Sequence, residues 1–208
     1  MMSRCVLSIL LLLFPTFLCA GNDNANAVEA RRLFNKVYDL VFGKEGSSLT
    51  YSVNIIGLYK TQGNIVYKGK KLYYMESRYA SWQDGVTAYM VDKKKKTIGI
   101  YNVDDDKKDA YLAKFKYDVN NFDFSYKTSC DYYEITAKVK NSSFFGIKRV
   151  TAMVHRKTLY PVSMNIKLAF ISTTVKISNF KSGNINDKIF VFPKSKYVGY
   201  TVTDNRGK

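Results

Sequence analysis

The stretch that decides the fold runs from Gly63 to Tyr101 and reads GNIVYKGKKLYYMESRYASWQDGVTAYMVDKKKKTIGIY. Short runs rich in isoleucine, valine and tyrosine alternate in it with turn residues, of which Asp84-Gly85 is the strongest signal. Residues 93–96, all lysine, separate the strand patterns 86–91 and 97–102, which predicts a hairpin with a solvated lysine tip. The stretch therefore predicts consecutive antiparallel strands.

Strand-like alternation continues on both sides of this stretch. Upstream, residues 49–60 alternate between apolar and polar side chains, and a strand is predicted there. Residues 104–117 break the pattern and are predicted to form a loop with a short helix. The remaining predicted strands are 64–68, 72–79, 121–126, 132–139, 144–155, 162–170, 173–180 and 189–192.

One helix is predicted before the strands, from Ala30 to Gly43. Its apolar residues recur with the spacing of one helix face, and Gly43 is a natural residue to end it. An antiparallel sheet buries one apolar face, which a helix can cover. The expected fold is mainly β with α: an open antiparallel half-barrel of about 9 to 11 strands, in which the N-terminal helix and the short helix form a lid over an apolar cavity.

The first twenty residues have the layout of a secretory signal peptide. A basic start, 1–4, precedes an apolar core, 6–14, that is too short for a bilayer, which takes about twenty residues. Cleavage is predicted near residue 20 or as late as 27, and 21–29 are expected to be a flexible leader. Residues 30–208 contain no internal repeat or linker, so one exported domain is expected.

Residue types that catalysis needs are scarce in this chain. It has one histidine, His155, and of its 3 cysteines only Cys130 lies in the predicted domain, so neither a zinc site nor an internal disulfide is expected. A Ser-His-Asp triad would have to use His155, and no Gly-x-Ser-x-Gly elbow accompanies it. We therefore expect a protein that is not an enzyme and has no cofactor.

The formal net charge is +16, carried mostly by lysine. Dispersed lysines suit a general attraction to anionic surfaces, such as lipid headgroups, better than base reading, which favours arginine. An anionic membrane surface is therefore a candidate partner, and nucleic acid is not expected. A secreted basic protein that binds polyanions, either nucleic acid or polysaccharide, is the alternative function.

Aromatic residues are abundant, with 17 tyrosines and 13 phenylalanines, and they occupy both alternations of some strands. The second set can either lie on the outer face with its hydroxyls in water or line a cavity for an apolar ligand, and the pattern leaves both readings open. The predicted residues of a lipid-binding cavity are Leu33, Phe34, Val37, Val53, Ile55, Ile65, Tyr67, Tyr73, Met75, Met164 and Ile166.

The order of these pieces resembles the LolA-type family, the periplasmic carriers of outer-membrane lipoproteins. The shared pieces are the first helix, the strand Gly63-Asn64-Ile65-Val66-Tyr67, the Asp84-Gly85 hairpin and the closing Phe190-Val191-Phe192-Pro193. The resemblance covers essentially the whole chain after the signal peptide. It implies a periplasmic carrier of acylated lipoproteins whose partners are an inner-membrane releasing complex and an outer-membrane acceptor; we expect a monomer.

Two positions depart from the family pattern. Gly69 stands in the turn where proteobacterial members carry an arginine associated with passing the cargo onward, and Tyr89 stands where the family has a tryptophan. These differences concern the handover more than the binding of lipid. Because the same fold also serves lipid-binding lipoproteins and envelope-stress sensors, a lipid-binding envelope sensor is a further alternative.

Overall fold

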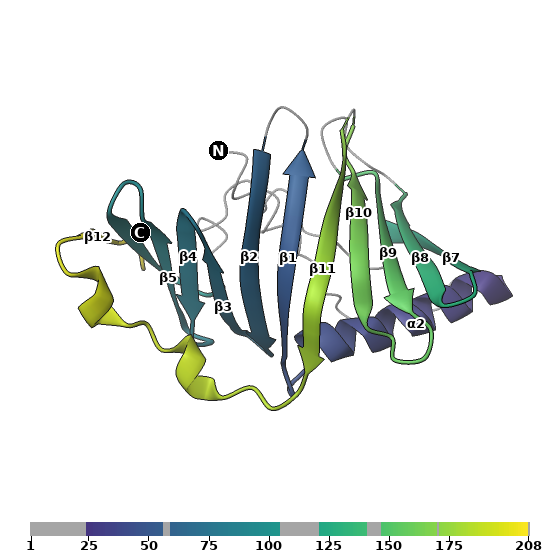
Figure 1. The fold of residues 1–208 in the computed structure, drawn as a ribbon, viewed down its shortest axis with the longest axis horizontal. Helices are drawn as coiled ribbons and strands as arrows, with labels where there is room; N and C mark the ends of the chain where they lie inside the picture. Colours follow the sequence, from purple (N-terminus) through teal and green to yellow (C-terminus); the bar gives the residue numbers. More distant parts are fainter. Residues whose placement is uncertain (1–23, 56–58, 105–120, 141–146, 170, 208) are drawn as a thin grey trace.

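The computed structural model describes residues 24–207 except 56–58, 105–120, 141–146 and 170. Its strands form one 12-stranded sheet in the order β12-β6-β5-β4-β3-β2-β1-β11-β10-β9-β8-β7 (Figure 1). Two antiparallel meanders meet where β1 pairs with β11, and β12 adds to β6 in parallel. The predicted open, mainly antiparallel half-barrel with an N-terminal helix is confirmed.

The helix and the two meanders have the following bounds. The helix is α2 Ala25–Phe42, and the strands are β1 Ser47–Ile55, β2 Tyr59–Lys68, β3 Lys71–Glu76, β4 Tyr79–Gln83, β5 Thr87–Asp92, β6 Thr97–Asn102, β7 Phe122–Thr128, β8 Tyr132–Val139, β9 Arg149–His155, β10 Pro161–Lys167 and β11 Ser172–Ser182. The C-terminal segment then contains two short 3-10 helices, η3 Asp187–Phe190 and η4 Lys194–Tyr197, and β12 Thr201–Asp204.

The helix begins earlier than predicted. The Asn24 side chain accepts a hydrogen bond from the Ala27 N–H at 2.9 Å and caps the first turn, so residues 25–29 are helical and not a flexible leader. Gly43 ends the helix as predicted, and a Cβ there would lie 2.3 Å from the Asp39 carbonyl oxygen. The predicted signal peptide and the short helix after Asp104 lie outside the described residues.

Four strand predictions are wrong in detail. The predicted strand 49–60 runs past the end of β1 at Ile55 and into β2, which begins at Tyr59. The predicted strand 72–79 is two strands, β3 and β4, because the chain bends at Ser77 and Arg78 without a glycine or proline. Gly63 lies in the middle of β2 and not at its start; the Tyr51 ring packs over it, with Cε1 only 2.9 Å from where a Cβ would be. The predicted strand 189–192 overlaps η3, which the Asn186 side chain caps.

Strand register assigns side chains to two faces of the sheet. Leu49 pairs with Ile65, and Ile65 pairs with Tyr74, so these three lie on one face, which also packs against α2; we call it the helix face. Tyr73 pairs with Trp82 on the opposite face. The C-terminal segment packs on that opposite face, which we call the tail face.

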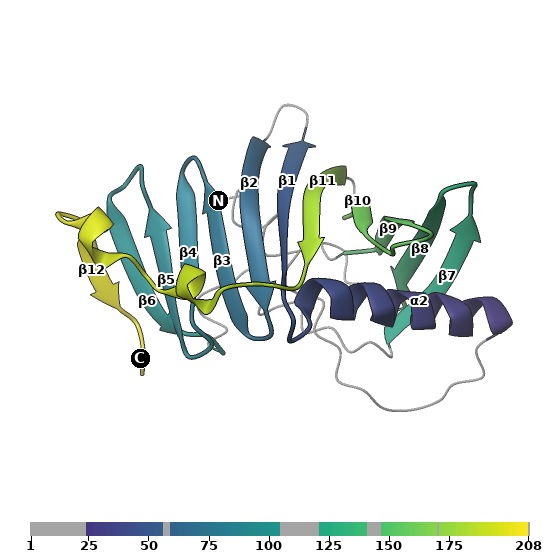
Figure 2. The same cartoon turned by 60° about the horizontal axis from the view of Figure 1, so that its bottom comes forward.

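The tail face is covered by aromatic stacking. The Phe192 ring stacks on Tyr89 with ring centroids 4.4 Å apart, and the Trp82 ring contacts Phe192 and Tyr197 edge-on at 5.4 and 5.6 Å. Figure 2 shows the C-terminal segment in yellow crossing this half of the sheet towards β12. Part of the second aromatic set is therefore structural: it holds the C-terminal segment against the sheet.

Helix α2 is held against the sheet at its N-terminal end and along its middle. The Asn26 side-chain amide donates a hydrogen bond to the Tyr126 carbonyl oxygen and accepts one from the Tyr126 N–H, both at 3.1 Å. Because β7 is an edge strand, this amide takes the place of a neighbouring strand at Tyr126. Leu33 is buried with Ile135 and Val154. These contacts place the apolar stripe of α2 over the half of the sheet that contains β7 to β11.

Candidate functional site

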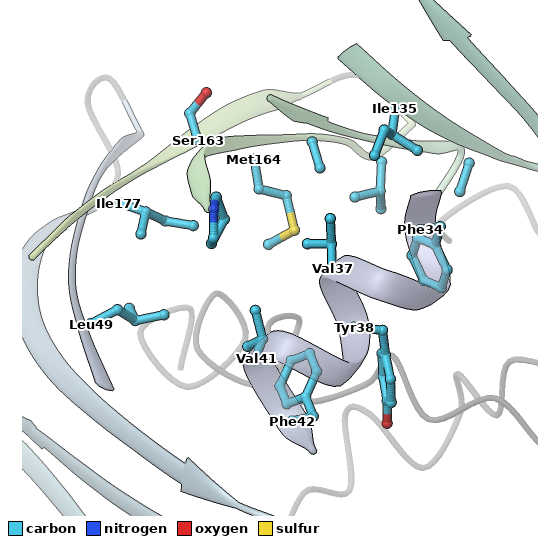
Figure 3. A pocket seen from close by; sticks show the side chains of 14 residues that line it. Phe34, Val37, Tyr38, Val41, Phe42, Leu49, Ile135, Ser163, Met164 and Ile177 are labelled. Atoms are coloured by element: carbon cyan, nitrogen blue, oxygen red, sulfur yellow. The ribbon is translucent and has the colours of Figure 1, made fainter. Parts of the chain in front are cut away.

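An apolar cavity lies between α2 and the helix face of the sheet (Figure 3). The cavity volume is about 80 Å³, within about 740 Å³ of space that protein atoms do not fill and that is partly continuous with solvent. The enclosed part is therefore narrow. The lining residues are Phe34, Val37, Tyr38, Val41, Phe42, Leu49, Ile135, Ala137, Val150, Ala152, Pro161, Ser163, Met164 and Ile177.

Almost every atom that lines the cavity is carbon or sulfur. Figure 3 shows the Met164 side chain pointing towards Val37 on the helix, whereas the hydroxyl of Ser163 points away from the cavity. Burial, and to a smaller extent the neighbouring Asp39, raises the pKa of Tyr38 to about 12, so its hydroxyl stays neutral at physiological pH. No residue of the lining is ionised, which suits an apolar guest.

Three aromatic side chains form a ladder along α2. Phe34, Tyr38 and Phe42 are four residues apart, with ring centroids separated by 6.3 and 4.9 Å. The ladder contacts the sheet at each end, where Phe34 meets Phe124 at 5.2 Å and Phe42 meets Tyr67 at 4.7 Å. The ladder therefore spans the cavity and joins the helix to strands in both halves of the sheet.

The structure brings only part of the predicted cavity together. Phe34, Val37 and Met164 line it. Five others are buried in the surrounding core without lining it, and the side chain of Ile55 lies outside the described residues. The five are Leu33, Val53, Ile65, Tyr67 and Ile166.

Tyr73 and Met75 do not face the helix, so the prediction that they line the cavity is wrong. Tyr67 pairs with Leu72, which places residues 72, 74 and 76 on the helix face and the other alternation on the tail face. Tyr73 and Met75 pack there with Trp82 and Ala80. A strand read one residue out of phase exchanges its two faces, and both alternations of β3 are apolar enough to permit either reading.

Several lining residues were missed by sequence reasoning. Ile135 and Ala137 alternate with charged or polar neighbours in β8, so the sequence pattern predicts their burial. Ile177 alternates with Lys176 and Ser178 in the same way, whereas Ala152 and Pro161 carry no comparable signal. They enter the site because β9, β10 and β11 pair in this order opposite α2, which no local pattern states.

A buried carboxylate stands elsewhere on the helix face. Glu76 is 5% exposed and accepts hydrogen bonds from the hydroxyls of Tyr51 at 3.3 Å, Thr61 and Tyr74. Burial, and then the neighbouring Tyr51 and Glu76, raise the pKa of Tyr74. The hydroxyls satisfy the carboxylate in place of water, which makes this cluster a structural polar node within the core.

Other residues considered for chemistry are dispersed. The His155 ring packs edge-on against Tyr132, with centroids 5.9 Å apart, and Cys130 is an exposed free thiol. Across the parts of the chain that the structure describes, no group of three or more histidine, cysteine, aspartate or glutamate side chains could hold a metal ion. No helix among the described residues is long and apolar enough to cross a membrane.

No protein-family model matches this sequence, and no curated protein matches it at the level of sequence. Several solved structures share its fold. An uncharacterised conserved protein from Thermus thermophilus has a TM-score of 0.58 and 8% identity, over 85% of this chain and 99% of that chain.

Two further structures have printed descriptions that concern lipoproteins. A LolA superfamily protein from Nitrosomonas europaea has a TM-score of 0.41 and 9% identity, over 79% of this chain and 98% of that chain. A putative outer membrane lipoprotein-sorting protein domain from Vibrio parahaemolyticus has a TM-score of 0.42 and 8% identity, over 83% and 99%. A LolA superfamily protein is thus among the structures similar to this chain.

Proposed function

We propose that this protein is a carrier that binds the acyl chains of lipoproteins under α2 and delivers them across the periplasm to the outer membrane. The observation that carries the proposal is the cavity between α2 and five strands, whose lining contains no ionised side chain. Such a cavity offers nothing to a polar substrate and no group for bond breaking. Its lining matches the chemistry of a hydrocarbon chain.

The energetics suit reversible carriage. Each methylene moved from water into the cavity contributes about 0.8 kcal/mol, and a single acyl chain gives only marginal, reversible attachment to a bilayer. A cavity that buries part of one chain can therefore compete with a membrane without trapping its cargo. Release then requires an acceptor that binds the chain more strongly, and no chemical step is needed.

The turn at Gly69 bears on how cargo is released. Gly69 is exposed with a φ of +55°, and the flanking Lys68 and Lys71 both pair with Asp187 of η3 at 3.0 and 3.1 Å. These lysines are occupied in holding the C-terminal segment, so they do not replace the arginine of the family pattern. Lys70, the remaining cation of the turn, pairs with the exposed Asp104 at 3.3 Å. We propose that the handover in this protein does not use an arginine at this turn.

The test is lipid extraction from the purified protein followed by mass spectrometry, with binding of a fluorescent fatty acid as the quantitative assay. Met164→Gln places an amide in the cavity, where a buried polar group without a partner costs about 1 to 3 kcal/mol, so affinity should fall at least fivefold. Met153→Gln is the matched control, because Met153 lies on the neighbouring strand with its side chain 37% exposed.

The outcomes separate the candidate functions. Co-purifying lipid and a selective loss of binding in Met164→Gln support the carrier. An empty cavity together with tight, salt-sensitive binding of nucleic acid or heparin would instead support the polyanion-binding alternative. Equal binding by the two folded variants would show that the fatty acid sits elsewhere.

A further inference from the structure

Five hairpin tips or strand ends, distant in sequence, lie along one edge of the sheet. This edge is formed by the ends of the strands and not by an outer strand. Register pairs Ile55 with Tyr59, Asp92 with Thr97, and Lys138 with Arg149, so the ends of these strands share that edge. Figure 2 shows the β3–β4 and β5–β6 tips side by side along it. We call its basic residues the basic rim: Lys60, Arg78, Lys94, Lys95, Lys96, Lys140, Lys148, Arg149 and Lys167.

The basic rim has little negative charge to balance it among the described residues. Asp92 is 5% exposed and forms an ion pair with Arg78 at 2.9 Å, and Asp123 is 3.6 Å from Lys140. The opposite edge also carries many bases, but more of them lie near carboxylates. These carboxylates are Glu45, Asp84, Asp104, Asp131 and Asp187. Among the described residues, nine bases from distant segments therefore stand against two carboxylates on the rim, an arrangement that the spread of lysine in the sequence does not reveal.

The lysine tip within this rim is held in one backbone conformation. The Asp92 carboxylate accepts hydrogen bonds from the backbone N–H groups of Lys94 and Lys95 at 3.0 and 3.1 Å, in addition to its pair with Arg78. Lys93 turns inward, and its ammonium group donates to the Glu76 carbonyl oxygen. Three exposed lysines therefore project from a turn whose backbone is already ordered, which lowers the entropy lost on docking.

The rim is long and includes an apolar residue. Neighbouring strands lie about 4.8 Å apart, so the nine spacings from β6 to β8 give the rim a length of roughly 40 Å along the curved edge. Ile171, 37% exposed, lies between Lys167 and β11. A row of flexible lysine side chains with an apolar residue among them suits a binding partner whose surface is negatively charged, broad and laterally fluid.

We propose that the basic rim docks this protein onto an anionic lipid bilayer. Lysines outnumber arginines in the rim, and one of its two arginines is committed to Asp92, so the fork geometry that reads nucleic-acid bases is scarce. Lysines near an anionic surface attract it without a fixed geometry. This inference concerns a surface and not the cavity, so it stands or falls independently of the acyl-chain proposal.

The test measures the partitioning of the purified protein onto vesicles of phosphatidylcholine with about 30% phosphatidylglycerol, by sedimentation, at about 50 and 150 mM salt. The rim variant is K94S/K95S/K96S. The control is K44S/K157S/K188S, which removes the same charge from three exposed lysines outside the rim. Each lysine near the surface contributes about fivefold in binding, so the rim variant should lose roughly 100-fold at low salt, and the control at most a few fold.

Three results would overturn the inference. One is equal loss in the two variants, which would mean that total charge and not the rim drives association. Another is salt-insensitive partitioning. The third is DNA binding that depends on the rim, without vesicle binding. Thermal unfolding verifies that each variant is folded. If the triple variant is unstable, K60S/K167S replaces it, because these two lysines lie at other points of the rim. Fatty-acid binding, measured in parallel, should be unchanged, so a failure of the cavity would be recognised separately.

Discussion

Filling the cavity should weaken binding without unfolding the protein, and Ala152→Leu is the substitution that tests this. Ala152 lies on β9 between Ile135 of β8 and Met164 of β10, and its Cβ borders the cavity. Leucine adds three carbon atoms to the lining. If each displaces about one methylene of ligand at about 0.8 kcal/mol, the loss is about 2.4 kcal/mol, or roughly 60-fold in affinity.

The assay is displacement of a fluorescent fatty acid, followed in parallel with thermal unfolding. Because the new side chain enters space that is empty of protein atoms, stability should change by no more than about 1 kcal/mol, less than the cost of overpacking a filled core. Ser125→Leu, exposed on the outer face of β7, controls for added hydrophobicity. A folded Ala152→Leu protein with wild-type affinity would refute the assignment of the ligand to this cavity.

Two further predictions concern stability. Trp82→Ala should destabilise the protein by about 3 to 5 kcal/mol in thermal or denaturant unfolding, because it removes the ring under Phe192, yet fatty-acid affinity should persist since the tail face is separated from the cavity by the sheet. The second concerns Asp92, whose pKa is lowered: its burial opposes ionisation, but the hydrogen bonds from Arg78 and the Lys95 and Lys94 N–H groups outweigh that effect. The stability that ionised Asp92 gives the folded protein should be complete above a pH of about 4 and should decline as the pH falls through the folded-state pKa. Asp92→Asn should cost about 1 kcal/mol at neutral pH. Denaturant midpoints measured against pH should show the decline in the wild-type protein and not in this variant.

Local periodicity was enough to predict the elements around the site. The 3.6-residue repeat of Phe34, Val37 and Val41 marks the side of α2 that covers the sheet, and Gly43 marks its end. The lysine run marks a hairpin tip in the structure as well. Such features follow from neighbours within a few residues along the chain, which is the range over which sequence patterns carry information.

Face assignment was less secure wherever both alternations were apolar. In β1, Val53 alternates with polar residues, and it lies on the helix face as predicted. In β3, tyrosines occupy both alternations, so the Gly69 turn and its register with β2 decide that Tyr74, and not Tyr73, faces inward. The bend at Ser77 that creates β4 contains no glycine or proline to indicate it.

The sequence by itself determined an aromatic, lysine-rich, mainly β chain with one amphipathic helix and few residue types suited to catalysis. The tertiary structure decided where the cavity is and which bases from distant segments come together in the basic rim. Both depend on pairing between distant segments, such as Val53 with Val175, where β1 joins the two meanders, and on the placement of α2 against β7. Contacts of that kind arise from the global arrangement of strands, and no window of neighbouring residues contains them.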